Sequence, residues 1–430
     1  MPEPTAPAGR DENRRDLLAL ALLAPVVGAV TGLVGAVFRL SLLAADHARD
    51  WVIGELPGRG IAGLALVVLA CAAAAMAAAW LVRRFSPHAL GSGIPHVEAV
   101  LEGELPPADF RMIPVKFVGG VLAIGSGLAL GREGPTVQMG AGIAHLVGLL
   151  FRRSWPDCRV LLAAGAGAGL ATAFNAPIAG AIFVLEELVR RFDTKIAIAA
   201  LGASATAIGV ARLMLGDAPD FHVEPLAFPS AESRPLFFVL GALAGLLAIL
   251  YNRTLLATLA AADRLGRWPV ELRAGLIGAA VGALAWFAPA LVGGGDPITQ
   301  QMLLGAGSLA LIPLFLLARL ALGAVSYAAG TPGGLFAPML VLGAQLGLLV
   351  GVLCQQVFPG LAIQPQAFAV VGMAALFTGV VRTPLTGIVL VIEMTASFTM
   401  FLPMLGACFM AMLVPTLLRD PPIYESLRRR

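Results

Sequence analysis

The sequence predicts an all-α integral membrane protein made of tilted and broken helices that form two inverted-topology repeats. Of its 430 residues, 58% are hydrophobic and only 13% are charged, against a charged share of roughly 25% in soluble domains. The chain holds 50 glycines and 30 prolines, and irregular backbone within a membrane survives only where protein or a water-filled cavity satisfies it. This composition excludes a soluble enzyme, a nucleic-acid binder and a secreted disulfide scaffold.

Apolar spans follow one another along almost the whole chain. The first begins near Leu17, after a polar segment whose Arg10, Arg14 and Arg15 favour a cytoplasmic N-terminus. Several spans fall short of the roughly 20 residues needed to cross a bilayer, which indicates half-helices that meet within the membrane. The expected spans are 17–44, 61–82, 112–130, 136–151, 160–174, 177–190, 196–216, 236–262, 269–290, 302–328, 335–357, 366–381, 384–396 and 400–418.

The charge distribution predicts an orientation. The linker between the halves carries Asp217, Asp220, Glu224 and Glu232 before its first basic residue, Arg234, and is expected to face outward. Short loops that are rich in lysine and arginine usually lie on the cytoplasmic side of the membrane. The clusters expected on that side are Arg83-Arg84, Arg152-Arg153 with Arg159, Arg190-Arg191, the arginines 253, 264, 267 and 273, and Arg428-Arg429-Arg430.

These boundaries predict five parts. They are a cytoplasmic N-terminal segment 1–16, membrane repeat 1 at 17–216, an extracytoplasmic linker at 217–235, membrane repeat 2 at 236–418 and a cytoplasmic C-terminal segment 419–430. The four cysteines are scattered and predict neither a disulfide nor a zinc site.

The two halves of the chain repeat the same short motifs. Gly131-Arg-Glu-Gly-Pro135 and Gly334-Leu-Phe-Ala-Pro338 share a G-x-x-x-P frame at an offset of 203. The motif P-x-x-G followed by a glutamate occurs at 177–186 and again at 384–393, at an offset of 207. Because the second half would enter the membrane from the opposite face, the repeat is inverted, and a binding site is expected between the halves. Glu186 and Glu393 are expected to hold helix ends together.

Three glycine-proline clusters predict helix N-termini that point at one place. They span 91–95, 131–135 and 333–338. Proline is favoured in the first turn of a helix, and the amides there offer unpaired N–H donors and a partial positive charge. Three such ends would make an anion site without a full cation, which suits an ion that must bind and then leave. Taken singly, each cluster could equally be a tight turn between helices.

Together these motifs resemble the CLC family of chloride channels and chloride/proton antiporters, of the prokaryotic type without cytoplasmic nucleotide-binding domains. The resemblance extends in order from about residue 20 to 427. It implies a CLC-like fold and a homodimer with one pathway per subunit. It rests on GSGIP at 91–95, GREGP at 131–135 continuing TVQMGA, FNAPIAG at 174–180, GGLFAP at 333–338, PLTG at 384–387 and Tyr424.

The resemblance implies that Ser92 donates its hydroxyl to a central anion and that the Tyr424 phenol closes the same site from the intracellular side. By itself, a serine between two glycines is a neutral donor or simply satisfies a turn. Tyr424 alone would fit an interfacial anchor better. The remaining donors are expected among the backbone N–H groups of Gly93, Ile94, Gly134, Leu335 and Phe336.

Glu133 is the strongest candidate for a functional residue. A carboxylate beside helix N-terminal amides mimics the anion with which it competes. Ionised, it blocks the path; protonated, it loses that attraction and swings out. An intramembrane acid is functional by default, although Glu133 could instead form a structural pair with Arg132. The resemblance implies that Glu133 is the external gate and the proton acceptor.

Glu187 is the second carboxylate of interest. The resemblance places it where antiporters carry the acid that transfers protons from the cytoplasm, and where passive channels of the family generally have a non-acidic residue. The alternative is a solvated helix face on which it pairs with Arg190 or Arg191.

Three further positions qualify the resemblance. His96 stands where a second acid is common in close relatives, and a structural role is expected for it. Glu98 and Glu102 are expected to neutralise Lys116 on a nearby helix. Serine at 92 argues against the nitrate-preferring variants with proline there and against the fluoride-exporting branch with methionine.

The sequence therefore predicts a secondary active chloride/proton antiporter of the inner (cytoplasmic) membrane, multi-pass with both termini cytoplasmic. Its partners would be chloride, with bromide or nitrate as further candidates, protons, the lipid bilayer and a second copy; no cofactor, metal or nucleic acid is expected. A passive chloride channel on the same fold is the alternative. The sequence argues against an intramembrane enzyme that uses Ser92. His88 and His96 lie too close to Ser92 in sequence to argue for a catalytic dyad, and no metal-ligand spacing occurs.

Overall fold

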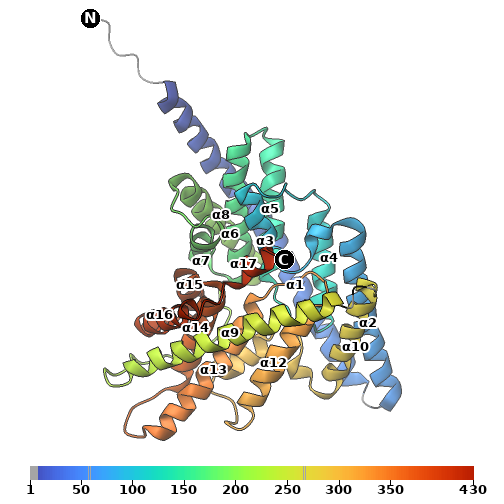
Figure 1. Ribbon diagram of the computed structural model, residues 1–430. Coiled ribbons are helices and arrows are strands. Elements are labelled where there is room, and N and C mark those ends of the chain that lie inside the picture. Colours follow the sequence, from blue (N-terminus) through green and yellow to red (C-terminus); the bar gives the residue numbers. More distant parts are fainter. Residues whose placement is uncertain (1–7, 57, 59, 265, 267) are drawn as a thin grey trace, which may run out of the picture.

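The computed structural model describes residues 8–430 except 57, 59, 265 and 267, with side chains from residue 16 onward. Residues 1–15 of the predicted N-terminal segment, which include Arg10, Arg14 and Arg15, therefore lie outside the described side chains, as does Arg267 of the basic clusters. In the described part the chain is helical and forms no strand (Figure 1). The helices are α1 Ala8–Glu55, α2 Gly60–Phe85, α3 Ile94–Glu102, α4 Met112–Gly125, α5 Glu133–Leu150, α6 Trp155–Phe174, α7 Pro177–Phe183, α8 Thr194–Leu215, α9 Arg234–Arg264, α10 Val270–Phe287, α11 Asp296–Leu303, α12 Ile312–Tyr327, α13 Phe336–Val357, α14 Pro365–Val381, α15 Pro384–Thr395, α16 Phe401–Leu417 and α17 Ile423–Arg428.

Long and short apolar helices are mixed, as predicted. Eight of the described helices are long and apolar enough to cross a membrane, and four shorter apolar ones, α4, α12, α14 and α15, accompany them. At 1.5 Å per residue, the 48 residues of α1 extend about 72 Å, more than twice the hydrocarbon thickness of a bilayer. Such a helix must be strongly tilted or reach beyond the bilayer, and Figure 1 shows α1 and α9 as long rods that cross the other helices.

Several expected boundaries are wrong. The span expected at 302–328 begins too early: α11 ends at Leu303, the chain turns at Gly305, where φ is +73°, and α12 begins only at Ile312. The first span continues past Ala44 to Glu55, and its last turns carry the paired charges Asp46 and Arg49. The span expected at 177–190 is helical only to Phe183 and continues as a π-helix over 184–188.

Equivalent positions of the two repeats have equivalent geometry. Asn175 and Arg382, at the offset of 207, are both left-handed residues that end a helix just before a proline-led one. α5 crosses α6 where Gly140 meets the Gly165 carbonyl, and α13 crosses α14 where Gly343 meets the Gly372 carbonyl. A methyl group on either of these close approaches would collide with the backbone opposite. The repeat read from short motifs therefore extends to helix packing.

The repeats are also joined through reciprocal helix caps. The Glu186 carboxylate accepts hydrogen bonds from the N–H groups of Leu385 (3.0 Å) and Thr386 (2.7 Å) at the start of α15. The Glu393 carboxylate accepts from Ile178 (3.1 Å) and Ala179 (2.8 Å) at the start of α7. The prediction that these two acids hold helix ends together is confirmed.

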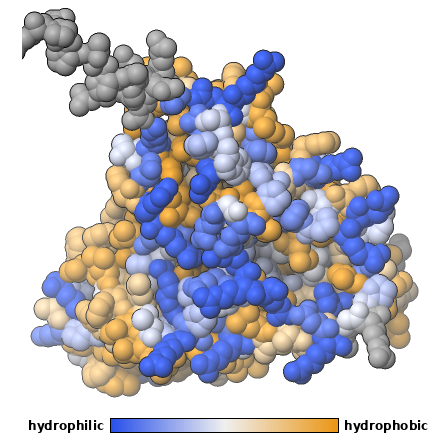
Figure 2. Space-filling view, turned by 45° about the horizontal axis from the view of Figure 1, so that its top comes forward, coloured by the Kyte–Doolittle hydropathy of each residue, from blue (hydrophilic) through white to orange (hydrophobic). Residues whose placement is uncertain are grey.

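Charged side chains form two groups at separate levels of the molecule. One group links the ends of several elements through Arg153–Asp16, Arg428–Glu102, Arg83–Glu271 and Arg253–Asp420. The other contains Arg39–Asp220 and Arg132–Asp296, beside the linker. On the face shown in Figure 2, hydrophilic side chains gather across the middle and hydrophobic ones occupy the flanks.

Candidate functional site

Backbone hydrogen bonds bring the three glycine-proline clusters together. Gly91 donates to the Thr331 carbonyl (3.2 Å) and accepts from Gly333 (3.0 Å). Gly131 donates to Gly334 (2.9 Å) and accepts from it (2.7 Å). The last two residues are equivalents at the offset of 203, so the repeats meet at this point. The N-termini of α3, α5 and α13 begin two or three residues beyond these bonds, as the glycine and proline pattern predicts.

Glu133, the first residue of α5, turns its carboxylate toward the N-terminus of α13. Its Oε1 accepts a hydrogen bond from the Phe336 N–H at 2.6 Å. The side chain is fully buried, and its Oε2 has no hydrogen-bond partner among the described residues. A carboxylate therefore occupies the position at a helix N-terminus where an anion would bind.

Two hydroxyl groups lie beside this carboxylate without protein partners. Ser92 Oγ and the Tyr424 hydroxyl are buried and lie close to one another, and neither makes a hydrogen bond to any other described residue. The Ser92 N–H is already used, because it donates to the Tyr327 hydroxyl at 3.3 Å. Buried polar groups are normally paired, so two neighbouring hydroxyls without other partners indicate a place for a polar ligand.

Other residues predicted to bind the anion lie close to these two hydroxyl groups. A methyl group built on Gly134 would stand 2.6 Å from both Ser92 oxygens, so the two residues are in close contact. The Tyr424 ring lies 5.9 Å from the Phe336 ring. Ile94 and Leu335 are buried in the same core. The structure thus brings Ser92, Gly134, Phe336 and Tyr424 together; Ile94 and Leu335 are buried, and Gly93 is the left-handed residue before α3.

The prediction for Lys116 is wrong. Its ammonium is fully buried and donates to the carbonyl oxygens of Ala89 (3.1 Å) and Gly91 (2.7 Å), not to a carboxylate. Glu102 pairs instead with Arg428 of α17 at 2.7 Å, and Glu98 faces Glu187. Lys116 extends to the loop before Ser92, so backbone carbonyls take the place that the sequence assigned to acids.

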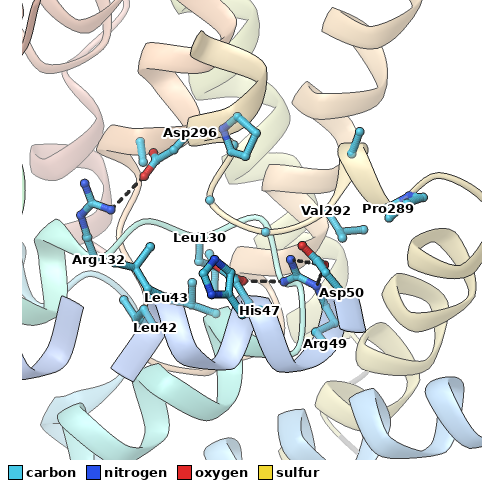
Figure 3. Close-up of a pocket in the computed structure, with 18 of the residues that line it drawn as sticks. Leu42, Leu43, His47, Arg49, Asp50, Leu130, Arg132, Pro289, Val292 and Asp296 are labelled. Atoms are coloured by element: carbon cyan, nitrogen blue, oxygen red, sulfur yellow. Dashed lines mark hydrogen bonds and ion pairs between the residues drawn. The ribbon is translucent and has the colours of Figure 1, made fainter. Parts of the chain in front are cut away.

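Arg132 points away from Glu133. Its guanidinium donates to the Ala173 carbonyl (2.8 Å), to Asp296 (2.8 Å) and to Asp220 (3.0 Å). It lines a cavity of about 570 Å³ with the end of α1, the loop before α11 and the first turn of α13. Figure 3 shows Arg132 joined to Asp296 on one side of this cavity and the charges of α1 on the other. The structural pair of Arg132 with Glu133 is therefore wrong.

Glu187 lies in the π-helical segment at the other end of the site. Its side chain is 4% exposed, and its Oε1 is 3.7 Å from Arg190 Nη2. Of the alternative, the pairing with Arg190 is present, but the solvated face is wrong, because Glu187 is buried with Glu98 beside it. It also lines a wide second cavity of about 640 Å³ with Arg190, Arg191 and Arg382. π-helical turns are rare and occur frequently at functional sites.

Three features of the site were not predicted. Tyr327 holds the Ser92 amide, and the only signal for it was the scarcity of tyrosine in the chain. The π-helical turn leaves no mark in the hydrophobic pattern. Asp220 was assigned to the linker, but its contact with Arg132 joins residues 88 positions apart. His96, expected to be structural, packs its ring 4.7 Å from that of His88.

Comparison with known proteins adds independent findings. The family profile described as voltage gated chloride channel matches residues 72–416. The H(+)/Cl(-) exchange transporter ClcA of Vibrio parahaemolyticus serotype O3:K6 is 37% identical over 419 residues, which cover 96% of this chain and 90% of that protein. The ClcA protein of Vibrio cholerae serotype O1 (strain M66-2) is 38% identical over 98% of this chain and 91% of its own length.

Solved structures resemble the whole fold. The crystal structure of a slow cyanobacterial Cl⁻/H⁺ antiporter has a TM-score of 0.92 and 34% sequence identity, and the match covers 96% of this chain and 97% of that one. A eukaryotic CLC transporter has a TM-score of 0.83 at 26% identity, and the match covers 96% of this chain and 74% of that one.

Proposed function

The chain belongs to the CLC family of voltage-gated chloride channels and related transporters, and on that basis we propose that it is a secondary active antiporter that exchanges chloride for protons. The observation that carries the proposal is the hydrogen bond from the Phe336 N–H to the Glu133 carboxylate, next to the orphaned hydroxyls of Ser92 and Tyr424. One group that can be charged or neutral thus occupies a position suited to an anion. The relatives named as H(+)/Cl(-) exchange transporters favour exchange over a passive channel.

Chloride binds between the helix N-termini in the proposed mechanism. Ser92 and Tyr424 donate through their hydroxyls, and the first turns of α3, α5 and α13 contribute the backbone N–H groups of Gly93, Ile94, Gly134, Leu335 and Phe336. Lys116 and Arg132 donate to other partners and do not add a full positive charge to these donors. Dipoles bind an anion without holding it as a full charge would, so chloride can leave.

Glu133 couples the two ions. Ionised, its carboxylate holds the Phe336 amide and excludes chloride; protonated, it loses most of that attraction and moves away, and chloride enters. Glu187 supplies protons from the opposite side, because it is buried, its Oε1 accepts no hydrogen bond from the described residues, and it lines a cavity open at the protein surface. The proton and chloride routes share only Glu133, so each cycle exchanges the ions in opposite directions.

The arrangement in the membrane follows the charge distribution. We place the linker at 217–235 outside and both terminal segments, 1–16 and 419–430, in the cytoplasm of the cell whose inner membrane holds the protein, with the two repeats between them. Glu133 then faces outward and Glu187 inward. We also propose a homodimer with one pathway in each subunit, and bromide and nitrate as further permeant anions.

Simultaneous chloride and proton flux from proteoliposomes tests this function. A chloride gradient should drive protons uphill, and a proton gradient should shift the potential at which chloride flux reverses. Chloride current with a reversal potential that ignores the pH gradient would instead identify a passive channel. Failure to move chloride at all would refute both.

A further inference from the structure

An ion-pair network lies beside the cavity of about 570 Å³, which we call the outer mouth of the site. It contains one carboxylate for which the proposed mechanism has no role. Asp220 lies on the linker between the repeats and is 3% exposed at its side chain. Its Oδ1 accepts from Arg39 Nη2 of α1 at 2.7 Å, and its Oδ2 accepts from Arg132 Nη2 at 3.0 Å. One buried carboxylate thus separates two guanidinium groups.

The network is neutral as a whole. Arg132 also pairs with Asp296 at 2.8 Å, so two arginines face two aspartates. Arg39, Arg132 and Asp296 line the cavity, which also touches Gly131 and Ala337, neighbours in sequence of the Glu133 and Phe336 turns; Asp220 does not line it and lines a small neighbouring cavity with Arg39 and Asn175. A permeant anion in the first cavity therefore meets the arginines directly and Asp220 only through them.

The remaining charges of this cavity form their own cluster. Arg49 pairs with Asp46 at 2.7 Å and with Asp50 at 3.0 Å, and His47 lies beside them on α1 (Figure 3). With one arginine and two aspartates, this cluster has one net negative charge and offers no positive charge to an anion. The strength with which the cavity attracts anions accordingly depends on how completely Asp220 neutralises Arg39 and Arg132.

Asp220 is held in place by its neighbours on the linker. The Phe221 N–H donates to the Met394 carbonyl at the end of α15 (3.0 Å). His222 and Gln300 of α11 exchange two hydrogen bonds, at 2.9 and 2.7 Å. These contacts fix the linker to the second repeat, while Asp220 contacts arginines of the first. The carboxylate cannot follow the arginines if they move.

From this geometry we propose that Asp220 is a positioning residue that sets the chloride affinity of the outer mouth by neutralising and fixing Arg39 and Arg132. The inference rests on the proposed exchange function. Without the Asp220 charge, Arg132 still contacts Asp296 and the Ala173 carbonyl. The net charge of the four-residue ion-pair network then changes from zero to one positive. One unit charge about 10 Å from an anion changes its binding constant by roughly four- to fifteenfold at protein-surface dielectric values.

The test uses variants that change the mouth charge in opposite directions. Asp220→Asn adds one positive charge and should tighten chloride binding, measured by calorimetry at low ionic strength, at least fourfold. Arg39→Gln removes one and should weaken it by a similar factor. The double variant restores neutrality and should bind within twofold of the unmodified chain. If these two residues only supported the fold, both single variants would change the chloride affinity in the same direction.

Matched controls separate this effect from general charge and from folding. Glu224→Gln removes one acid from an exposed part of the same linker and should leave chloride affinity within twofold. Asp220→Glu keeps the charge and should bind like the unmodified chain. The ratio of protons to chloride should not change in any variant, since Glu133 and Glu187 are intact.

Two results would overturn the inference. One is an Asp220→Asn affinity equal to or weaker than that of the unmodified chain; the other is a double variant that binds chloride as tightly as Asp220→Asn alone. Either result, obtained while the unmodified chain still exchanges protons for chloride, refutes the role of Asp220 and leaves the proposed function standing. Absence of exchange in the unmodified chain refutes the function itself.

Discussion

Replacing Glu133 with alanine should tighten chloride binding, end proton coupling and leave chloride flux running. The carboxylate now occupies the Phe336 N–H at 2.6 Å, and its side chain is fully buried. Chloride must displace this intramolecular competitor before it can use the same donor. Alanine removes the competitor and leaves its space for the anion.

The hydrogen bond sets the size of the effect. A hydrogen bond to a charged group contributes about 1.5–3 kcal/mol, so losing the competitor should raise chloride affinity by roughly 10- to 150-fold. The gain should depend on pH in a definite direction. Protonation neutralises the carboxylate and weakens its hold on the amide, so the unmodified chain should bind chloride more tightly as pH falls. Glu133→Ala should bind with an affinity that does not vary with pH.

Calorimetry on purified protein gives the affinity, and proteoliposomes give the two fluxes. Glu133→Gln is the matched control, because the amide keeps the size of the side chain and removes its charge; it should also lose coupling. The reasoning fails if Glu133→Ala binds chloride no more tightly than the unmodified chain, or if its vesicles still drive protons uphill on a chloride gradient.

Three further predictions follow from separate contacts. Glu187→Gln should keep chloride flux and lose proton movement, and unchanged coupling in the same vesicles would remove this acid from the proton route. Glu393→Gln removes the charge that accepts from the Ile178 and Ala179 N–H groups and should destabilise the fold by about 1–3 kcal/mol, seen as a lower melting temperature with normal coupling; an unaltered melting temperature would contradict this. Gly134→Ala places a methyl group 2.6 Å from Ser92 Oγ, and because overpacking typically costs about 1–3 kcal/mol, chloride affinity should fall roughly tenfold; a normal affinity would show that Ser92 does not bind the anion.

Glycine and proline carried most of what the sequence could predict. They mark positions where the backbone turns sharply or comes close to another chain segment, and both demands are local. The three clusters therefore located the N-termini of α3, α5 and α13, and the offsets of 203 and 207 predicted the repeat that Gly140 and Gly343 later displayed as helix crossings. Glu186 and Glu393 followed from the same register.

Partners of charged residues could not be predicted in the same way. A long side chain can reach any of several helices. Lys116 was therefore predicted to contact two acids, but in the structure it donates to two carbonyl oxygens. Arg132 similarly takes Asp220 and Asp296, which are 88 and 164 residues away. The π-helical turn around Glu187 escaped as well, because one additional residue per turn hardly alters an apolar stretch. Which cation meets which anion is decided by packing.

The exchanged caps of Glu186 and Glu393 bear on how such a chain could arise. Each glutamate closes the first turn of a helix in the other half, and the two contacts are equivalent. A half-length ancestor inserted into the membrane in both directions would already have made this contact twice between two identical molecules. Joining two copies of that gene through a linker would then have preserved a working interface, and only afterwards could the halves diverge into one that carries a movable acid and one that receives it.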